Sequence, residues 1–310
     1  MIKKLCIIGY GAHTKKTLIP SFKKLNNKYL KIISSKNIKL DFEIYENLNV
    51  ALNNLDKKYF FYNCTPPNQH FSTSKKILLN GFNLIIEKPI CLNINQLQIL
   101  TTLAKKKKLI LIENMMYFQT KQFKYFNNIF SSIVHIKSLQ INFNIPSFDI
   151  SSFRSIDMQK DTLLLDDVLC YPLSLLVFYD INLKDYDITY KYRNKYLSTL
   201  KVTSKYKNFN IYINIGFFKK YKNNVSIVCK DKSSYTFNHF FYGKKLIKEN
   251  LIYKNNNLKI KKINDLNSFS YLLKLNSYEL KKLSNLSIVL AKKYLPIVNK
   301  IKKYLSNKSY

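Results

Sequence analysis

The chain begins with a series of short apolar runs separated by amphipathic stretches, and this alternation limits the possible folds more than any other feature. The runs are Leu5–Ile8, Leu30–Ile33, Phe60–Cys64, Leu84–Ile86 and Leu109–Ile112. A strand that is apolar at nearly every position needs cover on both faces, which the intervening helices of a parallel sheet provide. We therefore expect an α/β fold whose first domain, residues 1–118, contains a doubly wound parallel sheet.

After about residue 132 the apolar pattern changes to a period of two residues. In residues 139–145 and again in residues 209–217, Leu, Ile and Phe alternate mainly with Gln, Asn and Tyr. Such strands have one buried and one solvated face, which is typical of antiparallel sheets. Helices are expected over about residues 161–179 and 285–305, the latter with a kink at Pro296. Residues 119–310 are thus predicted to form an α+β domain with a large, mostly antiparallel open sheet.

The net charge of +34 is the strongest compositional signal, and it raises the question of nucleic-acid binding. The lysines, however, are dispersed among abundant Asn, Ile and Tyr, while Gly, Pro and Trp are scarce. Compositional drift explains this distribution better than a binding stripe, so nucleic acid is disfavoured as a partner. The five cysteines lack CxxC spacing, and no apolar run reaches the roughly 18 to 20 residues of a membrane span. We expect a cytoplasmic protein with no metal centre and no membrane partner.

Gly9-Tyr10-Gly11 follows the first predicted strand and precedes a helix that starts near Ala12 and His13. Glycines in this position permit a tight turn and a close approach of a diphosphate to the helix N-terminus. Thr14 stands where a third glycine often lies, so a plain strand-to-helix turn remains the alternative.

The second strand ends in Ser34-Ser35-Lys36, where an acidic residue would be needed to bind the ribose diol of NAD. Two hydroxyls and a cation suit a 2′-phosphate instead. This pattern favours NADP, with NAD still possible. The alternative is that Lys36 is one more surface lysine.

Two further motifs follow strands of the first sheet. The carboxyl ends of such strands are where open α/β sheets bind ligands. After the 60–64 run, Pro66 and Pro67 stop the strand and Asn68 can cap the next helix, which places His70 in its first turn. After the 84–86 run, a carboxylate and an ammonium follow an apolar strand. Burying charged groups costs free energy, so a functional role is expected for this pair. The residues are Thr65, Pro66, Asn68 and His70 in the first motif, and Glu87, Lys88 and Pro89 in the second.

In the second domain, Asp167 and Tyr171 are spaced to project from one face of an almost wholly apolar helix. A carboxylate and a phenol in such surroundings need partners. Pro172 lies in the same helix, where it removes an N–H group and favours a kink. Two ordinary helix surface residues would be the alternative explanation.

Taken together, these motifs resemble the glucose-fructose oxidoreductase, inositol dehydrogenase and rhizopine-catabolism (Gfo/Idh/MocA) family over nearly the whole chain. The resemblance implies a Rossmann domain that binds NAD(P), a C-terminal sheet that forms a homodimer or homotetramer interface, and hydride transfer at a sugar-like carbonyl or alcohol. It implies that Lys88 polarises the reacting oxygen, that Asp167 orients the substrate, and that Tyr171 occupies the position found in the tyrosine-containing branch of ketosugar reductases and sugar or dihydrodiol dehydrogenases. Nucleotide-linked ketosugars are the expected substrates.

The chain departs from the family pattern in two places. Asp161–Asp166 replaces a stretch that is usually glycine-rich, and Phe118 stands where an arginine often follows the Met-Tyr pair. These departures motivate a second hypothesis, an impaired or regulatory dinucleotide-binding protein without turnover. This second hypothesis is opposed by the presence of Lys88, Asp167 and Tyr171, which are retained although the composition of the chain has drifted.

Overall fold

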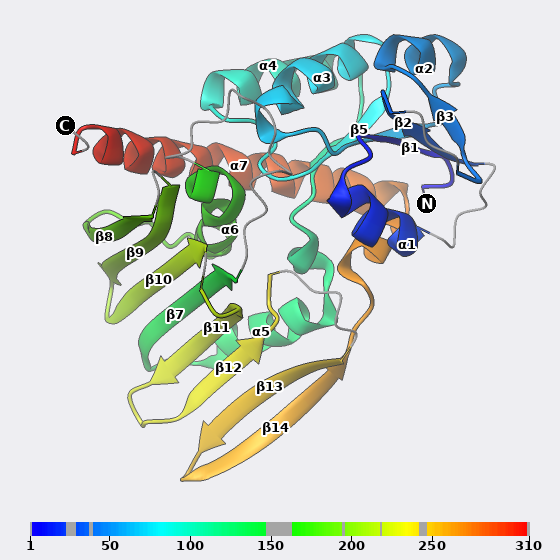
Figure 1. Cartoon of the computed structure of the whole chain (residues 1–310). Coiled ribbons are helices and arrows are strands. Elements are labelled where there is room, and N and C mark those ends of the chain that lie inside the picture. The colour runs from blue at the N-terminus through cyan, green and yellow to red at the C-terminus, as the bar shows by residue number, and fades with distance from the viewer. Residues whose placement is uncertain are drawn as a thin grey trace. The chain divides into compact units, whose positions relative to one another are not determined.

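The computed structural model describes residues 2–22, 29–36, 40–146, 163–193, 196–217, 219–241 and 247–308 (Figure 1). The chain divides into two compact units. In its described residues, unit 1 contains the chain up to Met115 together with the segment from Phe269 onward. Unit 2 contains residues 116–146 and the described residues from 163 to 268. No described helix is long and apolar enough to cross a membrane.

Unit 1 is built on a six-stranded sheet in the order β3-β2-β1-β4-β5-β6, with every neighbouring pair parallel. The chain moves outward in one direction from β1 and then in the other from β4, so the strand order reverses between these two strands. This is the doubly wound topology expected from the apolar runs. The bounds are β1 Leu5–Ile8, β2 Leu30–Ile33, β3 Glu43–Tyr45, β4 Phe60–Asn63, β5 Asn83–Ile86 and β6 Leu111–Glu113.

The short strand β3 was not among the sequence predictions. It lies at the sheet edge, its residues are exposed or half-buried, and Ile44 is its single aliphatic residue. An edge strand of three residues with little burial has no reason to form a continuous apolar run, which was the signal used for the other five.

Helices lie on both sides of this sheet, with α3 and α4 on one side and α1 on the other (Figure 1). Asn93 caps α4, because its side chain accepts a hydrogen bond from the Gln96 amide at 3.0 Å. The helical segments of unit 1 are η1 Thr14–Leu18 (a π-helix), α1 Ile19–Phe22, α2 Leu48–Asn54, α3 Pro67–Leu79, α4 Ile94–Lys106 and α7 Ser277–Ser306.

The C-terminal helix α7 belongs to unit 1, which differs from the single domain boundary expected at residue 118. Ser284 Oγ donates to the Leu111 carbonyl at 2.7 Å, and Ser287 Oγ accepts from the Glu113 amide at 3.2 Å, so the helix lies against the edge strand β6. A helix that returns over such a sequence separation leaves no local pattern. The helix also begins eight residues before the expected start, at a capping box of Asn276 and Glu279, and continues through Pro296.

Unit 2 contains an eight-stranded open sheet in the order β14-β13-β12-β11-β7-β10-β9-β8. Among the described strands of this sheet, only β7 and β10 pair in parallel, so the predicted mostly antiparallel character is confirmed. The bounds are β7 Ile136–Ile145, β8 Tyr186–Arg193, β9 Tyr196–Tyr206, β10 Phe209–Phe217, β11 Lys222–Cys229, β12 Ser234–Asn238, β13 Ile247–Lys254 and β14 Asn257–Asn264. The helical segments are η3 Met116–Gln119, α5 Lys121–Ser132, η5 Leu165–Leu169 (a π-helix), α6 Cys170–Phe178 and η6 Ser268–Lys274, whose first residue belongs to unit 2 and the remainder to unit 1.

The core of unit 2 is unusually aromatic. Phe118 is buried there, with ring centroids 4.9 Å from Phe123 and 5.2 Å from Phe178. At the position where the family often has arginine, this chain therefore has a core side chain. Helix α5 and the β12–β13 region add Phe126, Phe237, Phe240 and Phe241 to the same cluster.

Candidate active site

The glycine turn lies at the carboxyl end of β1, beside the end of β4. Gly9 adopts a φ of +97°, and a Cβ at this position would lie 3.1 Å from the Cys64 carbonyl oxygen. Both features require glycine. Thr14 supports the turn from the place of the third glycine, since its hydroxyl donates to the Gly9 carbonyl at 2.8 Å.

Gly11 has the opposite surroundings from Gly9. A Cβ at Gly11 would meet no atom within 4 Å, so the space in front of the helix start at Ala12 and His13 is open. First-turn amides of a helix lack intrahelical partners and point toward such a space. A diphosphate group fits this arrangement of open space and free amide donors.

The end of β2 holds the three residues predicted to meet an adenosine ribose. The Ser34 amide donates to the Tyr45 carbonyl at 3.0 Å, and the Ser34 hydroxyl accepts from the Lys36 amide at 3.1 Å. Ser35 and Lys36 are exposed. The backbone at this strand end is thus fixed by hydrogen bonds while two polar side chains face solvent. Their contact with a cofactor stays a prediction.

The motif after β4 differs in one respect from its predicted form. Helix α3 begins at Pro67, with Pro66 as its N-cap residue, so Asn68 does not cap the helix. Proline suits the first helical position because its missing N–H would have no intrahelical partner there. Asn68 Oδ1 is instead buried without a hydrogen-bond partner among the described residues. An orphaned buried oxygen in the first turn of α3 is consistent with a site for a ligand that carries donors.

His70 lies deeper than the sequence suggests. Its Nδ1 is 2.7 Å from the Pro89 carbonyl, and its Nε2 is 2.7 Å from the Thr65 carbonyl. Burial lowers the pKa of His70, against the opposing effect of these two contacts. The imidazole therefore joins the loop after β4 to the loop after β5, and positions Thr65 and Pro89. Contact between His70 and a cofactor stays a prediction.

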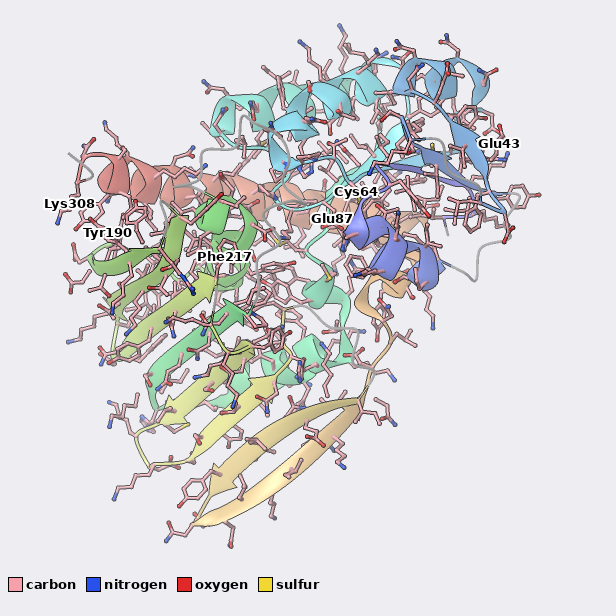
Figure 2. The ribbon with its side chains drawn as sticks, in the orientation of Figure 1. Glu43, Cys64, Glu87, Tyr190, Phe217 and Lys308 are labelled. Atoms are coloured by element: carbon pink, nitrogen blue, oxygen red, sulfur yellow. The ribbon has the colours of Figure 1, made fainter. Side chains whose placement is uncertain are left out.

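Glu87, at the end of β5, is the centre of a buried hydrogen-bond network. Its Oε1 accepts from the Tyr62 hydroxyl at 2.5 Å, and that hydroxyl accepts from Asn114 Nδ2 at 2.6 Å. His13 Nε2 lies 3.4 Å from the same Oε1. Burial alone raises the pKa of Glu87, but His13, the Tyr62 hydroxyl and the Lys88 charge outweigh it and lower the pKa to about 2. The carboxylate, which Figure 2 labels, is thus held ionised in a buried position.

Lys88 follows this carboxylate and is half-buried, with a cis peptide bond to Pro89. Its charge acts on two buried carboxyl groups, Glu87 and Glu113, and lowers the pKa of each. At Glu113 burial dominates, so the pKa is raised to about 7 although the Tyr294 hydroxyl and the Ile90 amide donate to Oε1. The ammonium of Lys88 therefore interacts with two buried carboxyl groups, Glu87 and Glu113, at the carboxyl end of the parallel sheet.

In unit 2, Asp167 lies in the π-helical segment η5 and Tyr171 in the first turn of α6. The Tyr171 ring is 2% exposed, with centroids 5.2 Å from Phe143 and 5.6 Å from Phe241. The π turn lies immediately ahead of Pro172, whose missing N–H interrupts the α-helical bonding pattern. The expected irregularity at Pro172 therefore takes the form of a π segment. Residues 161 and 162, the start of the predicted helix, lie outside the described residues.

Three residues of this region were not identified from the sequence, namely Tyr62, Asn114 and Glu113. Tyr62 belongs to an apolar strand run and was taken as a core residue, while Glu113 and Asn114 follow a strand that carried no recognised motif. A polar pair directly after a buried strand was a usable signal, of the same kind as Glu87-Lys88.

Comparisons with known proteins agree with this description. Residues 3–115 match the model of the Gfo/Idh/MocA oxidoreductase family, NAD-binding Rossmann fold. KijD10, a 3-ketoreductase from Actinomadura kijaniata solved with NADP and TDP-benzene, has a TM-score of 0.78 at 16% identity, covering 96% of this chain and 97% of that chain. A dehydrogenase from Chromobacterium violaceum has a TM-score of 0.75 at 12% identity, covering 98% and 97%. No curated protein matches in sequence.

Proposed function

Since unit 1 carries the NAD-binding Rossmann domain of the Gfo/Idh/MocA oxidoreductase family, we propose that this chain is an NADP-dependent reductase of a sugar-like carbonyl group. The observation that carries the proposal is the position of Lys88. This lysine follows the ionised Glu87 at the carboxyl end of β5, and β5 belongs to the same sheet as the open turn at Gly11. A cation held at this position, beside a dinucleotide site, can stabilise the negative charge that develops on a substrate oxygen.

Bound NADPH would supply a hydride to the carbonyl carbon of the substrate. The strand ends of unit 1 would hold the cofactor. Its diphosphate would lie at Gly11, Ala12 and His13, and its adenosine phosphate at Ser34–Lys36. The ammonium of Lys88 then stabilises the charge that develops on the substrate oxygen. Tyr171 donates the proton that completes the alcohol, and Asp167 orients the substrate.

Preference for NADP is supported by the polar end of β2 and by the NADP in the KijD10 structure. A sugar nucleotide is supported as substrate class by the TDP-benzene in that structure. The direct test is fluorescence titration of NADPH and NADH, followed by assays with nucleotide-linked 3-keto and 4-keto sugars. Tighter NADH binding would refute the cofactor assignment, and absence of turnover with NADPH bound would refute the enzymatic one.

The second candidate, dinucleotide binding without turnover, is favoured by one observation. Phe118 is part of the aromatic core and leaves no guanidinium at that position. This candidate predicts NADPH binding of ordinary affinity and no reduction of any ketosugar. A Phe118→Arg variant that gained turnover would support it, although a buried arginine carries a large desolvation cost.

We also propose a homodimer or homotetramer formed through the outer face of the unit 2 sheet. This face carries amides in register on adjacent strands, with Asn142 bonded to Asn224 at 3.0 Å and to Asn214 at 3.3 Å. Asn144 Oδ1 and Asn214 Oδ1 are buried without partners among the described residues. The five cysteines are free, which suits a reducing compartment such as the cytoplasm.

A further inference from the structure

Three side chains with metal-binding atoms meet at the carboxyl ends of the unit 1 strands. They are His13 at the start of the first helix, Cys64 directly after β4, and Glu87 directly after β5. One ligand atom of each lies within 4.8 Å of the corresponding atoms of the other two. Figure 2 marks Cys64 and Glu87 close to one another at this end of the sheet. This is the only such group of three among the described residues.

The state of each group is compatible with a ligand. His13 Nε2 is buried and makes no hydrogen bond to a described residue, although it lies 3.4 Å from Glu87 Oε1. Glu87 is ionised, with its pKa lowered to about 2, and Oε1 already accepts from Tyr62. The thiol of Cys64 keeps its proton because burial, together with the Glu87 charge, raises its pKa. An imidazole nitrogen without a hydrogen bond to a described residue therefore faces the Glu87 carboxylate and a thiol.

We propose that His13 Nε2, Cys64 Sγ and a carboxylate oxygen of Glu87 form a site for zinc(II) or a cation of similar chemistry. Imidazole, thiolate and carboxylate are the three ligand types that zinc prefers. Zinc–ligand bonds of about 2.0 to 2.3 Å in a tetrahedron place neighbouring ligand atoms about 3.3 to 3.7 Å apart. The present separations require movements of roughly an ångström, and the His13 side chain, 35% exposed, has room to turn.

The protons and charges of the binding step balance. Zinc(II) displaces the proton of the Cys64 thiol, which leaves to solvent, and a Zn–S bond replaces the S–H bond. The thiolate and the Glu87 carboxylate together carry two negative charges, which neutralise the metal ion, and an imidazole that coordinates a metal does so in its neutral form. Water takes the fourth position, as in zinc sites with three protein ligands. Metal affinity is therefore expected to increase as the pH rises.

The site overlaps the region assigned to the dinucleotide, so zinc and NADPH should exclude each other. This consequence rests on the proposed function, because His13 and Glu87 are among the residues assigned to the cofactor. The metal site itself rests only on the geometry of the three side chains. Zinc would then act as a reversible inhibitor of cofactor binding.

The metal site is tested by titrating the reduced, metal-free, full-length protein with cobalt(II), whose bond to a thiolate gives an absorption band. We expect one cobalt per chain, displaced by zinc. Cys64→Ser should abolish the band, and His13→Ala should weaken cobalt binding by at least the roughly tenfold seen for loss of a group that merely supports a ligand. Cys91→Ser is the matched control, because Cys91 is a buried cysteine of the same unit that contacts only the Asn93 carbonyl among the bonds described, at 3.4 Å.

The site is excluded if Cys64→Ser keeps the band, or if His13→Ala and wild type bind cobalt equally. His13 is partly exposed, so its variant remains informative even where Cys64→Ser fails to fold. A separate titration measures NADPH binding with zinc and with a chelator. If NADPH binds equally with and without zinc, the exclusion is wrong. If NADPH never binds, the proposed function fails while the cobalt result stands.

Discussion

The two units place polar chemistry in opposite ways. Unit 1 gathers charged groups at one end of a parallel sheet, where the buried Glu87 and Glu113 and the half-buried Lys88 act on one another. Unit 2 buries rings and amides, with the aromatic cluster around Tyr117 and Tyr171 and the asparagines of the outer sheet face. In an α/β sheet the strand ends are the positions where polar side chains can escape the dry core. In the proposed chemistry unit 1 therefore supplies the cation Lys88, while unit 2 supplies the Tyr171 phenol in dry surroundings and the Asp167 carboxylate.

The described part of unit 2 also buries charged side chains, among them Lys248 and Asp265, and the contacts of Lys248 show how they differ from those of unit 1. Lys248 Nζ donates to the His239 carbonyl at 2.7 Å, and burial lowers the pKa of Lys248 to about 8 despite the charge of Asp265. His239 has a φ of +54°, a rare backbone conformation for a residue other than glycine. The ammonium of Lys248 thus stabilises a loop, whereas Lys88 lies next to a carboxylate at a strand end.

The largest effect is expected for Lys88→Ala. If the ammonium stabilises the developing oxyanion, its removal should lower kcat by about a hundredfold to a thousandfold, or about 2.7 to 4 kcal/mol, with NADPH affinity largely kept. Steady-state kinetics on an identified ketosugar measures this. Lys75→Ala, an exposed lysine of α3, is the control and should turn over normally. Equal rates for both variants would mean that the charge of Lys88 has only a structural role.

Glu113→Gln is expected to change how stability depends on pH. The folded-state pKa of Glu113, about 7, lies above the ordinary 4.5, so the protonated form is favoured by folding. Its contribution is fully present below pH 4.5 and is lost as the pH rises through 7, which amounts to on the order of 3 kcal/mol. Urea unfolding between pH 4.5 and 8 should show this decline in wild type and a flatter curve in the variant. A parallel decline in both proteins would contradict the assignment.

Tyr171→Phe should lower kcat by about a hundredfold, the lower part of the range for general acid catalysis, because water can still deliver a proton. The variant keeps the ring that contacts Phe143 and Phe241. Tyr117→Phe is the matched control in the same cluster. It loses the hydrogen bond from the phenol to Ser174, 2.9 Å long, and should cost stability rather than activity.

How far the sequence could predict these features depends on the range of the interactions. Local patterns sufficed for the strands of unit 1 other than the edge strand β3, and for the position of Lys88 at a strand end. They could not show that Tyr62 and Asn114 meet at Glu87, because each partner lies in a different strand or loop and Tyr62 reads as a core residue. The return of α7 to β6 was hidden for the same reason. Cys64 also carried no signal, since nothing in its spacing connects it with His13.

The smallest effect is expected for Lys36→Asp, which tests whether the polar end of β2 selects the cofactor. The Lys36 amide bonds to the Ser34 hydroxyl, so the turn should persist when the side chain changes. A carboxylate there repels a 2′-phosphate and can accept hydrogen bonds from a ribose diol. Because exposed ion pairs contribute only about 1 kcal/mol, we expect the ratio of NADPH to NADH affinity to fall by about tenfold rather than by orders of magnitude. Fluorescence titration of both cofactors measures the ratio, with Lys75→Asp as the control for an added surface charge. An unchanged ratio would show that Lys36 is an ordinary surface lysine and that any selectivity arises elsewhere in unit 1.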